Sequence, residues 1–261
     1  MKKELLHFVE WKKLAPEKYP SVMEELASWG VKNIVAHPCF FKEEDPTCIR
    51  KIAVMLEDAG LKSTACHALW GKGNDCVIPE EDAWKGMIRR HEKFLDLLSE
   101  LGVKTYTFHL GVAHNEKWEN IASCVRRSVD ALLPVCERNG IVLALENGGE
   151  TLALLRKLSE FVAQYDHEYL GLCFDCGHAN CYGGGVAEVL EIMKENIVTC
   201  HLHDNFGMQD DHNPPGEGNI DWAELDALLD TLPRLFHAET ESGNWGEESW
   251  KSFCRVLKKP C

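Results

Sequence analysis

The run IVLALENG, residues 141–148, is apolar over its first five positions and then carries Glu146 and Asn147. Four other apolar runs also end in ionisable side chains: TYTFHLG (105–111), LGLCFDCGH (170–178), IVTCHLHDN (197–205) and LFHAETES (235–242). Short apolar runs of this kind predict β-strands. Ionisable side chains are expensive to place at the ends of buried strands unless something binds them. We therefore expect these strand ends to gather around a ligand.

Similar short runs alternate with amphipathic segments along the whole chain. We predict strands at about 4–11, 31–38, 62–69, 103–110, 141–147, 170–176, 197–205 and 234–241. We predict helices at about 21–30, 47–60, 81–101, 118–139, 151–166, 185–196, 221–232 and 246–258. Regular alternation of strands and helices predicts a parallel sheet. Eight units in 261 residues favour one α/β domain over 1–261, a single (β/α)8 TIM barrel with its site at the carboxyl ends of the strands.

Composition excludes several classes of partner. The formal net charge of −14 at pH 7 disfavours a nucleic acid, whose phosphates such a surface repels. We expect no membrane span and no signal peptide, because the chain lacks the apolar run that either one needs. The 12 cysteines are then expected to be reduced thiols of a cytoplasmic protein. Because neither G-x-G-x-x-G nor a P-loop follows a strand, we expect no nucleotide cofactor.

A carboxylate or an imidazole stands near the end of each of four consecutive predicted strands: Glu146, Asp175, His201 and Glu239. Residues two apart in a strand share a face, so His203 faces the same way as His201, and Glu241 faces the same way as Glu239. One such residue alone is more simply a hydrogen-bonded strand end. Four together favour a divalent metal, and mixed oxygen and nitrogen ligands suit Mn²⁺, Mg²⁺, Co²⁺ or Zn²⁺.

The segments LENG, GLCFDCGHAN, HLHDN and DDHNPPGEGNIDW resemble the xylose-isomerase-like barrel superfamily, and the resemblance covers nearly the whole chain. That superfamily holds sugar and sugar-phosphate isomerases and epimerases, and also the endonuclease-IV-type enzymes of DNA repair. The resemblance implies that the same four residues form the shared metal-binding quartet, with His203 as a competitor for the position of His201. It also implies further metal ligands or substrate contacts: His67, His109, His178, Asp210 and His212.

The resemblance implies an isomerase or epimerase that works by proton transfer. A divalent cation chelating a carbonyl and the adjacent hydroxyl stabilises the enediolate that forms when the neighbouring carbon loses its proton. A carboxylate above that carbon serves as general base, and we assign Glu146 and Glu239 as the catalytic pair. The expected substrate is a small sugar, keto-acid or polyol. A phosphorylated one is disfavoured, because phosphate usually needs an arginine or a helix N-terminus.

Two other functions on the same scaffold stay open. An endonuclease of the repair type uses three zinc ions, and this chain has a residue at each of that branch's metal positions, including the D-x-H of Asp210 and His212. Against it, the nine arginines fall in predicted helices or at the start of the last strand, and only scattered lysines such as Lys42, Lys72 and Lys117 occupy the expected rim. An inosose-type dehydratase would end the same chemistry in loss of water.

Four further residues are candidates for substrate contacts. The predicted loops above the mouth contain three tryptophans, Trp70, Trp118 and Trp245. The fourth candidate, Asn147, directly follows Glu146. An aromatic face there either packs on a sugar or anchors its loop to the barrel rim, and the sequence favours neither. Dimers and tetramers are common in the superfamily, so a homo-oligomer is compatible with the resemblance.

Overall fold

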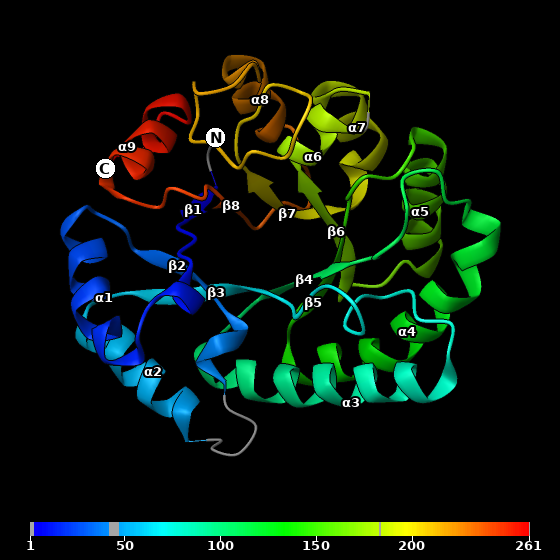
Figure 1. The fold of residues 1–261 in the computed structure, drawn as a ribbon, viewed down its shortest axis with the longest axis horizontal. Helices are drawn as coiled ribbons and strands as arrows, with labels where there is room; N and C mark the ends of the chain where they lie inside the picture. Colours follow the sequence, from blue (N-terminus) through cyan, green and yellow to red (C-terminus); the bar gives the residue numbers. More distant parts are fainter. Residues whose placement is uncertain (1–2, 42–46, 183, 261) are drawn as a thin grey trace.

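The structure is a computed structural model that describes residues 3–41, 47–182 and 184–260. Eight parallel strands form a barrel with the helices outside it, which confirms the predicted (β/α)8 TIM barrel (Figure 1). The strands are β1 (Glu4–Leu6), β2 (Asn33–Ala36), β3 (Lys62–His67), β4 (Thr105–His109), β5 (Val142–Glu146), β6 (Leu170–Asp175), β7 (Ile197–Leu202) and β8 (His237–Thr240). The helices are α1 (Tyr19–Ser28), α2 (Cys48–Asp58), α3 (Glu81–Leu98), α4 (Trp118–Asn139), α5 (Leu152–Tyr165), α6 (Cys176–Cys181), α7 (Val186–Met193), α8 (Trp222–Leu229) and α9 (Glu247–Val256).

The strands follow one another round the barrel in chain order, and β1 pairs with β8. The ring closes between the first two strands through a single bridge, in which His7 N–H donates to Asn33 O (2.9 Å) and Val35 N–H donates to His7 O (3.1 Å). The predicted strand 4–11 is therefore too long. The chain leaves the sheet after His7 and forms a short 3₁₀ turn, Trp11–Lys13, because the Trp11 ring packs on Phe40 at 5.1 Å.

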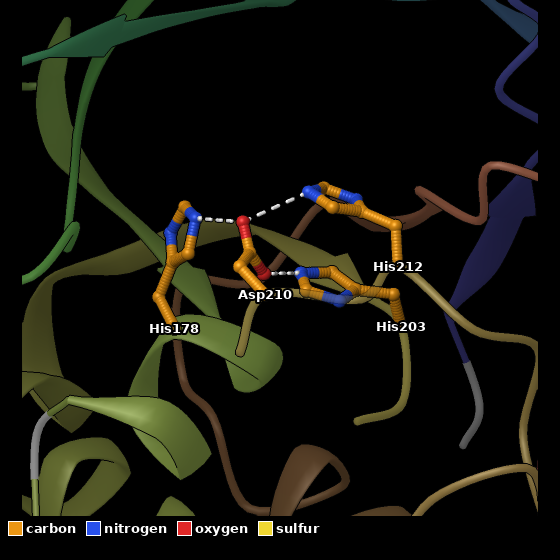
Figure 2. Close-up of side chains that lie close together, drawn as sticks. All are labelled: His178, His203, Asp210 and His212. Carbon is orange, nitrogen blue, oxygen red and sulfur yellow. Dashed lines mark hydrogen bonds and ion pairs between the residues drawn. The ribbon is translucent and has the colours of Figure 1, made fainter. Parts of the chain in front are cut away.

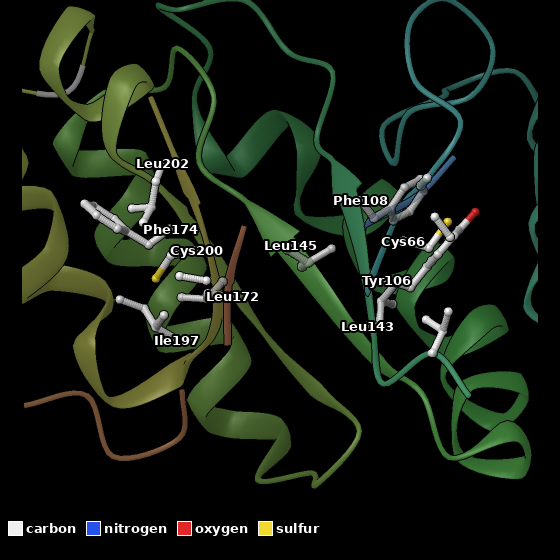
Figure 3. Close-up of a cluster of buried hydrophobic side chains, with 14 of the residues drawn as sticks. Cys66, Tyr106, Phe108, Leu143, Leu145, Leu172, Phe174, Ile197, Cys200 and Leu202 are labelled. Carbon is white, nitrogen blue, oxygen red and sulfur yellow. The ribbon is translucent and has the colours of Figure 1, made fainter. Parts of the chain in front are cut away.

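Side-chain alternation separates two apolar layers. Leu143, Leu145, Leu172 and Phe174 point outward and belong to the large core between barrel and helices (Figure 3). Their neighbours along the strands point inward, where Val142, Ala144, Cys173 and Val198 form a small cluster inside the barrel. The same alternation brings Glu146 and Asp175 to the inner face at the carboxyl ends of β5 and β6.

The helices differ from the predicted bounds mainly at their ends. The first begins at Tyr19 rather than at 21, with Pro20 in its first turn. The predicted helices 81–101 and 185–196 each end in a 3₁₀ turn, at Ser99–Leu101 and Lys194–Asn196. Helix α6 was not predicted. In the parts of the chain that the structure describes, no helix is both long and apolar enough to cross a membrane.

Asp204 fixes the long loop between β7 and α8. Its buried carboxylate accepts hydrogen bonds from Gly216 N (2.9 Å), Ile220 N (3.2 Å) and Trp222 Nε1 (2.9 Å). Its backbone also pairs with Asn213 in both directions. Since Asp210 lies in the loop that these bonds close, they hold its side chain at the mouth of the barrel.

Candidate metal centre

Among the described residues, side chains at the barrel mouth form five overlapping groups of possible metal ligands, with the ligand atoms of each group within 4.8 Å of one another. Three of these groups together contain every member except Cys173. The central group is Glu146, Asp175, His201 and Glu241. The histidine group is His67, His109 and Glu146. The loop group is His178, His203, Asp210 and His212. Glu146 belongs to both the central group and the histidine group, so the structure brings the predicted residues together around one carboxylate.

The central group surrounds one nitrogen of His201. The Nδ1 atom lies 3.0 Å from Glu146 Oε1, 2.9 Å from Glu241 Oε2 and 3.8 Å from Asp175 Oδ2. Three of the four residues are buried, and the side chain of Glu241 is 13% exposed. Three carboxylates and one imidazole from neighbouring strands make the mixed donor set that a divalent cation prefers.

Glu241 completes this group among the described residues, whereas the predicted Glu239 lies outside it, and which of the two carboxylates binds a metal stays a prediction. Glu239 lies level with His201 in the sheet, and its Oε2 is 3.5 Å from His201 Nε2, on the other edge of the imidazole. Its Oε1 accepts a hydrogen bond from Thr199 Oγ1 at 2.6 Å. Strands of a closed barrel tilt against its axis, so residues that pair in the sheet differ in height. Glu241, two residues further along, reaches the mouth instead.

The position of Glu239 suits a carboxylate that orients a ligand. A histidine that binds a metal through one nitrogen usually donates its other N–H to a carboxylate or carbonyl. Burial opposes ionisation of Glu239, but the contacts of His201 and His237 lower the pKa of its carboxyl group to about 2. An ionised Glu239 therefore accepts from His201 Nε2 while Nδ1 faces the central group.

The histidine group binds the other oxygen of Glu146. His109 Nε2 is 2.9 Å from Glu146 Oε2, and His67 Nε2 is 3.9 Å from it. His67 Nδ1 lies 2.9 Å from Ala68 O, which only accepts, so Nδ1 carries the hydrogen and Nε2 is left to bind a ligand. Although burial opposes it, His201 and His109 hold the pKa of Glu146 well below its usual value.

Asp210 lies at the centre of the loop group, as Figure 2 shows. Its Oδ2 is 3.0 Å from His212 Nε2 and 3.3 Å from His178 Nε2, and its Oδ1 is 3.7 Å from His203 Nε2. His178 lies in α6. This helix begins after Asp175, because the Asp175 carboxylate accepts a hydrogen bond from His178 N at 2.7 Å. His203 stacks on His212 at 4.0 Å, so it lies in this group rather than in the place of His201.

Backbone carbonyls orient two imidazoles of the loop group. His178 Nδ1 donates to Asn147 O at 2.9 Å, and His212 Nδ1 donates to Glu241 O at 2.7 Å. Burial opposes a positive charge on either ring. Even so, Asp175 and Asp210 raise the pKa of His178 well above its usual value, and Asp210 and Glu241 raise that of His212 to about 10. Without a metal, both rings are therefore protonated at neutral pH.

A cavity of about 370 Å³ opens over the three groups, a size that suits a small molecule. Its lining includes donor residues and also Phe8, Glu10, Lys12 and Trp70. Of these four, the sequence indicated only Trp70. The sequence missed the others because they follow β1, where the predicted strand was too long.

The remaining predicted contacts have structural partners. Asn147 is buried, and its amide donates to Asp175 O (2.9 Å) and accepts from Asp175 N (2.8 Å), which ties β5 to β6. Trp118 begins α4 and packs on Phe161 at 5.3 Å. Trp245 is partly buried against the core, and its carbonyl accepts from His7 Nε2. Among these side chains, Trp70 is the one that lines the cavity.

A family model described as a xylose isomerase-like TIM barrel matches residues 23–259, and the chain belongs to this family. An uncharacterized protein of Sinorhizobium fredii is 27% identical over 135 residues, which are 49% of this chain and 43% of that protein. An uncharacterized protein of Methanocaldococcus jannaschii is 34% identical over 121 residues, 42% of this chain and 41% of that protein. The chain thus matches less than half the length of these curated relatives.

Several solved structures share the fold over nearly the whole chain. A D-tagatose 3-epimerase-like protein is 22% identical, with 98% of this chain and 97% of that chain covered and a TM-score of 0.75. The 3-keto-D-glucoside 4-epimerase of E. coli is 16% identical, with 98% and 100% covered and a TM-score of 0.78. The IolI protein with a bound zinc atom is 18% identical, with 98% of each chain covered and a TM-score of 0.75.

Substitutions of Glu239, in β8, and of Glu241, just after it, are expected to affect metal binding differently. Glu241→Gln removes a ligand, so we expect the protein to lose the metal of its central group on desalting. Glu239→Gln keeps all four donors and loosens His201, so we expect the metal to stay, with affinity lowered about 10- to 100-fold. Metal content by mass spectrometry and competition with a chelator measure both effects. Loss of the metal from Glu239→Gln, with retention by Glu241→Gln, would restore Glu239 as the ligand.

The raised pKa values predict proton release when the loop group binds a metal. In the metal-free protein the pKa of His178 is raised well above its usual value and that of His212 to about 10, and each protonated ring must lose its proton to become a ligand. Titration calorimetry with Zn²⁺ in buffers of different ionisation enthalpy counts the protons. The wild type should release about two more protons on binding than a His178→Gln, His212→Gln double variant, and its affinity for Zn²⁺ should rise with pH. Equal proton release by the two proteins would show that the loop group does not bind the ion.

Proposed function

We propose that this protein is a divalent-metal-dependent isomerase or epimerase that acts on a small carbohydrate-like substrate by proton transfer. The observation that carries the proposal is a pair of carboxylates. Glu146 and Glu241 come from the carboxyl ends of β5 and β8, each lies within about 3 Å of His201 Nδ1, and both line the same cavity. A carboxylate beside a bound substrate can serve as the general base that removes a proton from carbon next to a carbonyl.

The residues present fit a divalent cation in the central group. Glu146 Oε2 is buried and accepts no aligned hydrogen bond among the described residues, although His109 Nε2 lies 2.9 Å from it, and a buried oxygen in this state suits a metal ligand or a group that receives a proton. The four central residues would hold the ion: Glu146, Asp175, His201 and Glu241. When bound, a divalent cation supplies positive charge that stabilises the negative charge developing on the substrate's oxygens.

The protein's own groups then move the proton. Burial opposes their ionisation, but the contacts with His201 lower the pKa of both carboxyl groups, so both start as bases. One carboxylate takes the proton from carbon, and the bonding electron pair moves toward the carbonyl oxygen. Return of the abstracted proton from the first carboxyl group to the neighbouring carbon, with a proton passing between the two substrate oxygens, isomerises the sugar. Inversion of the carbon instead needs the other carboxylate to take up a proton from solvent and deliver it to the opposite face, while the first releases the abstracted proton to solvent. We assign these roles to Glu146 and Glu241, with Glu239 holding His201 in place.

The fold neighbours support the class of substrate. Two are described as a D-tagatose 3-epimerase-like protein and a 3-keto-D-glucoside 4-epimerase, and a third carries zinc. The size of the cavity agrees with a monosaccharide or a small keto-acid. The identity of the metal, Mn²⁺, Zn²⁺, Mg²⁺ or Co²⁺, and the reaction outcome remain part of the proposal.

A second candidate is a phosphodiesterase of the endonuclease-IV type with three zinc ions. The observation in its favour is that the three groups together offer ligands for three ions. A DNA backbone also needs cations around the site. Among the described residues, Lys12 is the cation that lines the cavity, while Lys42 lies outside the described residues. The charge of the lining therefore favours the sugar enzyme.

Incubation with ketoses and sugar acids in deuterium oxide tests the proposal. The metal-loaded protein should place solvent deuterium on one carbon without change of formula, and loss of water would instead indicate a dehydratase. We expect Glu146→Gln and Glu241→Gln to slow exchange by about 10²–10⁴-fold, the contribution of a general base. The control, Glu137→Gln on the exposed surface of α4, should exchange like the wild type. Absence of exchange together with nicking of abasic duplex DNA would establish the second candidate.

A further inference from the structure

Lys12 is a charged group of the cavity that the proposed proton transfer leaves unused. It lies in the 3₁₀ turn after β1, and its side chain lines the cavity together with the metal-ligand candidates. Its Nζ atom lies 5.0 Å from the centre of the Trp70 ring. The nearby carboxylate Glu10 is bound by Lys13 instead, with Oε2 and Nζ 2.5 Å apart. Within the described parts of the chain, Lys12 has no ion-pair partner.

Trp70 fixes the ammonium group beside the metal-ligand candidates. Its ring meets His67 edge-on at 4.7 Å and His37 at 5.8 Å, and 37% of the residue is exposed. A cation over an aromatic face is attracted to it by about 0.5–1 kcal/mol at an exposed site. The ring is therefore a platform between Lys12 and the histidine group. Lys12 and the histidine group line the same cavity, so one small molecule in that cavity can contact both.

Lys12 differs from the other charged groups that line the cavity. The carboxylates and imidazoles belong mostly to the three donor groups, where bound cations would neutralise them. Lys12 stays positive and unpaired. Lys12 is exposed, and an ammonium group without a counter-ion still binds an anion, through a charge-assisted hydrogen bond, more strongly than it binds a hydroxyl.

We propose that the substrate is an acidic sugar, whose carboxylate binds Lys12 above Trp70 while its carbonyl end faces the donor groups. The proposal rests on the proposed function and names the class of its substrate. A carboxylate fits better than a phosphate, because a phosphate site usually adds an arginine, a helix N-terminus or several backbone N–H groups. Lys12 supplies one point charge.

Binding of two matched polyols tests the proposal without depending on turnover. D-gluconate and D-sorbitol share a six-carbon chain, and only gluconate has a carboxylate. Calorimetry with the Mn²⁺-loaded wild type should show gluconate binding about tenfold or more tighter, as expected for one charge-assisted hydrogen bond. Lys12→Met should abolish that preference, and Lys12→Arg should keep most of it. Lys251→Met, which removes an equal charge from α9, should bind like the wild type. Equal melting temperatures would show that the variants are folded.

Three results would overturn the proposal. Equal affinities for the two polyols, or no binding of either, would show that no carboxylate site exists. A preference that survives in Lys12→Met would place the carboxylate on the metal. Tighter, Lys12-dependent binding of sorbitol 6-phosphate would make the substrate a sugar phosphate. The deuterium experiment separates this proposal from the proposed function. Deuterium exchange without a Lys12-dependent preference for gluconate would contradict only the anion site. A Lys12-dependent preference for gluconate without deuterium exchange would contradict only the isomerase function.

Discussion

The buried carboxylate of Glu146 is the constraint on which the mouth of this barrel depends. Only 1% of the residue is exposed, and its oxygens face imidazoles, with His201 on one and His109 on the other. Removing an ion from water costs several kcal/mol unless a partner compensates for it. Imidazoles with raised pKa values compensate for it in the metal-free protein, and under the proposed function a divalent cation would take the place of their protons. The same side chains would then stabilise both the empty and the loaded site, and protons would compete with the metal.

The backbone sets the direction of three of these imidazoles. In His67, His178 and His212 the Nδ1 atom contacts a carbonyl, of Ala68, Asn147 and Glu241 respectively. Each Nε2 atom then points to a carboxylate, either Glu146 or Asp210. Each of these three carbonyls belongs to a residue just past the end of a strand. The residues just past the strand ends therefore orient imidazoles that come from β3, from α6 and from the loop after β7, and Asp204 holds the loop that carries His212 and Asp210.

Strand and helix periods were enough to predict the barrel and to place most of the candidate residues at its mouth. Glu146, Asp175 and His201 end strands, and alternation turns all three inward. Alternation does not separate Glu239 from Glu241, which share a face and differ only in height, because height depends on the tilt of the strands. Helix α6 is too short to show a helical period in the sequence. Its start is capped by the Asp175 carboxylate, which accepts a hydrogen bond from His178 N. Lys12 was missed because the apolar run before it continues past the point where β1 leaves the sheet.

Anomalous diffraction from crystals soaked in MnCl₂ or ZnCl₂ tests the central assignment most directly. The structure predicts an ion bonded to Glu146, Asp175, His201 and Glu241, with Glu239 at hydrogen-bond distance from His201 Nε2. Carboxylate and imidazole bonds of about 2.0–2.2 Å are expected for bound zinc, and the absorption edge of the anomalous signal identifies the metal. An ion that binds Glu239 and leaves Glu241 free, or a mouth that stays empty at saturating metal, would contradict the assignment.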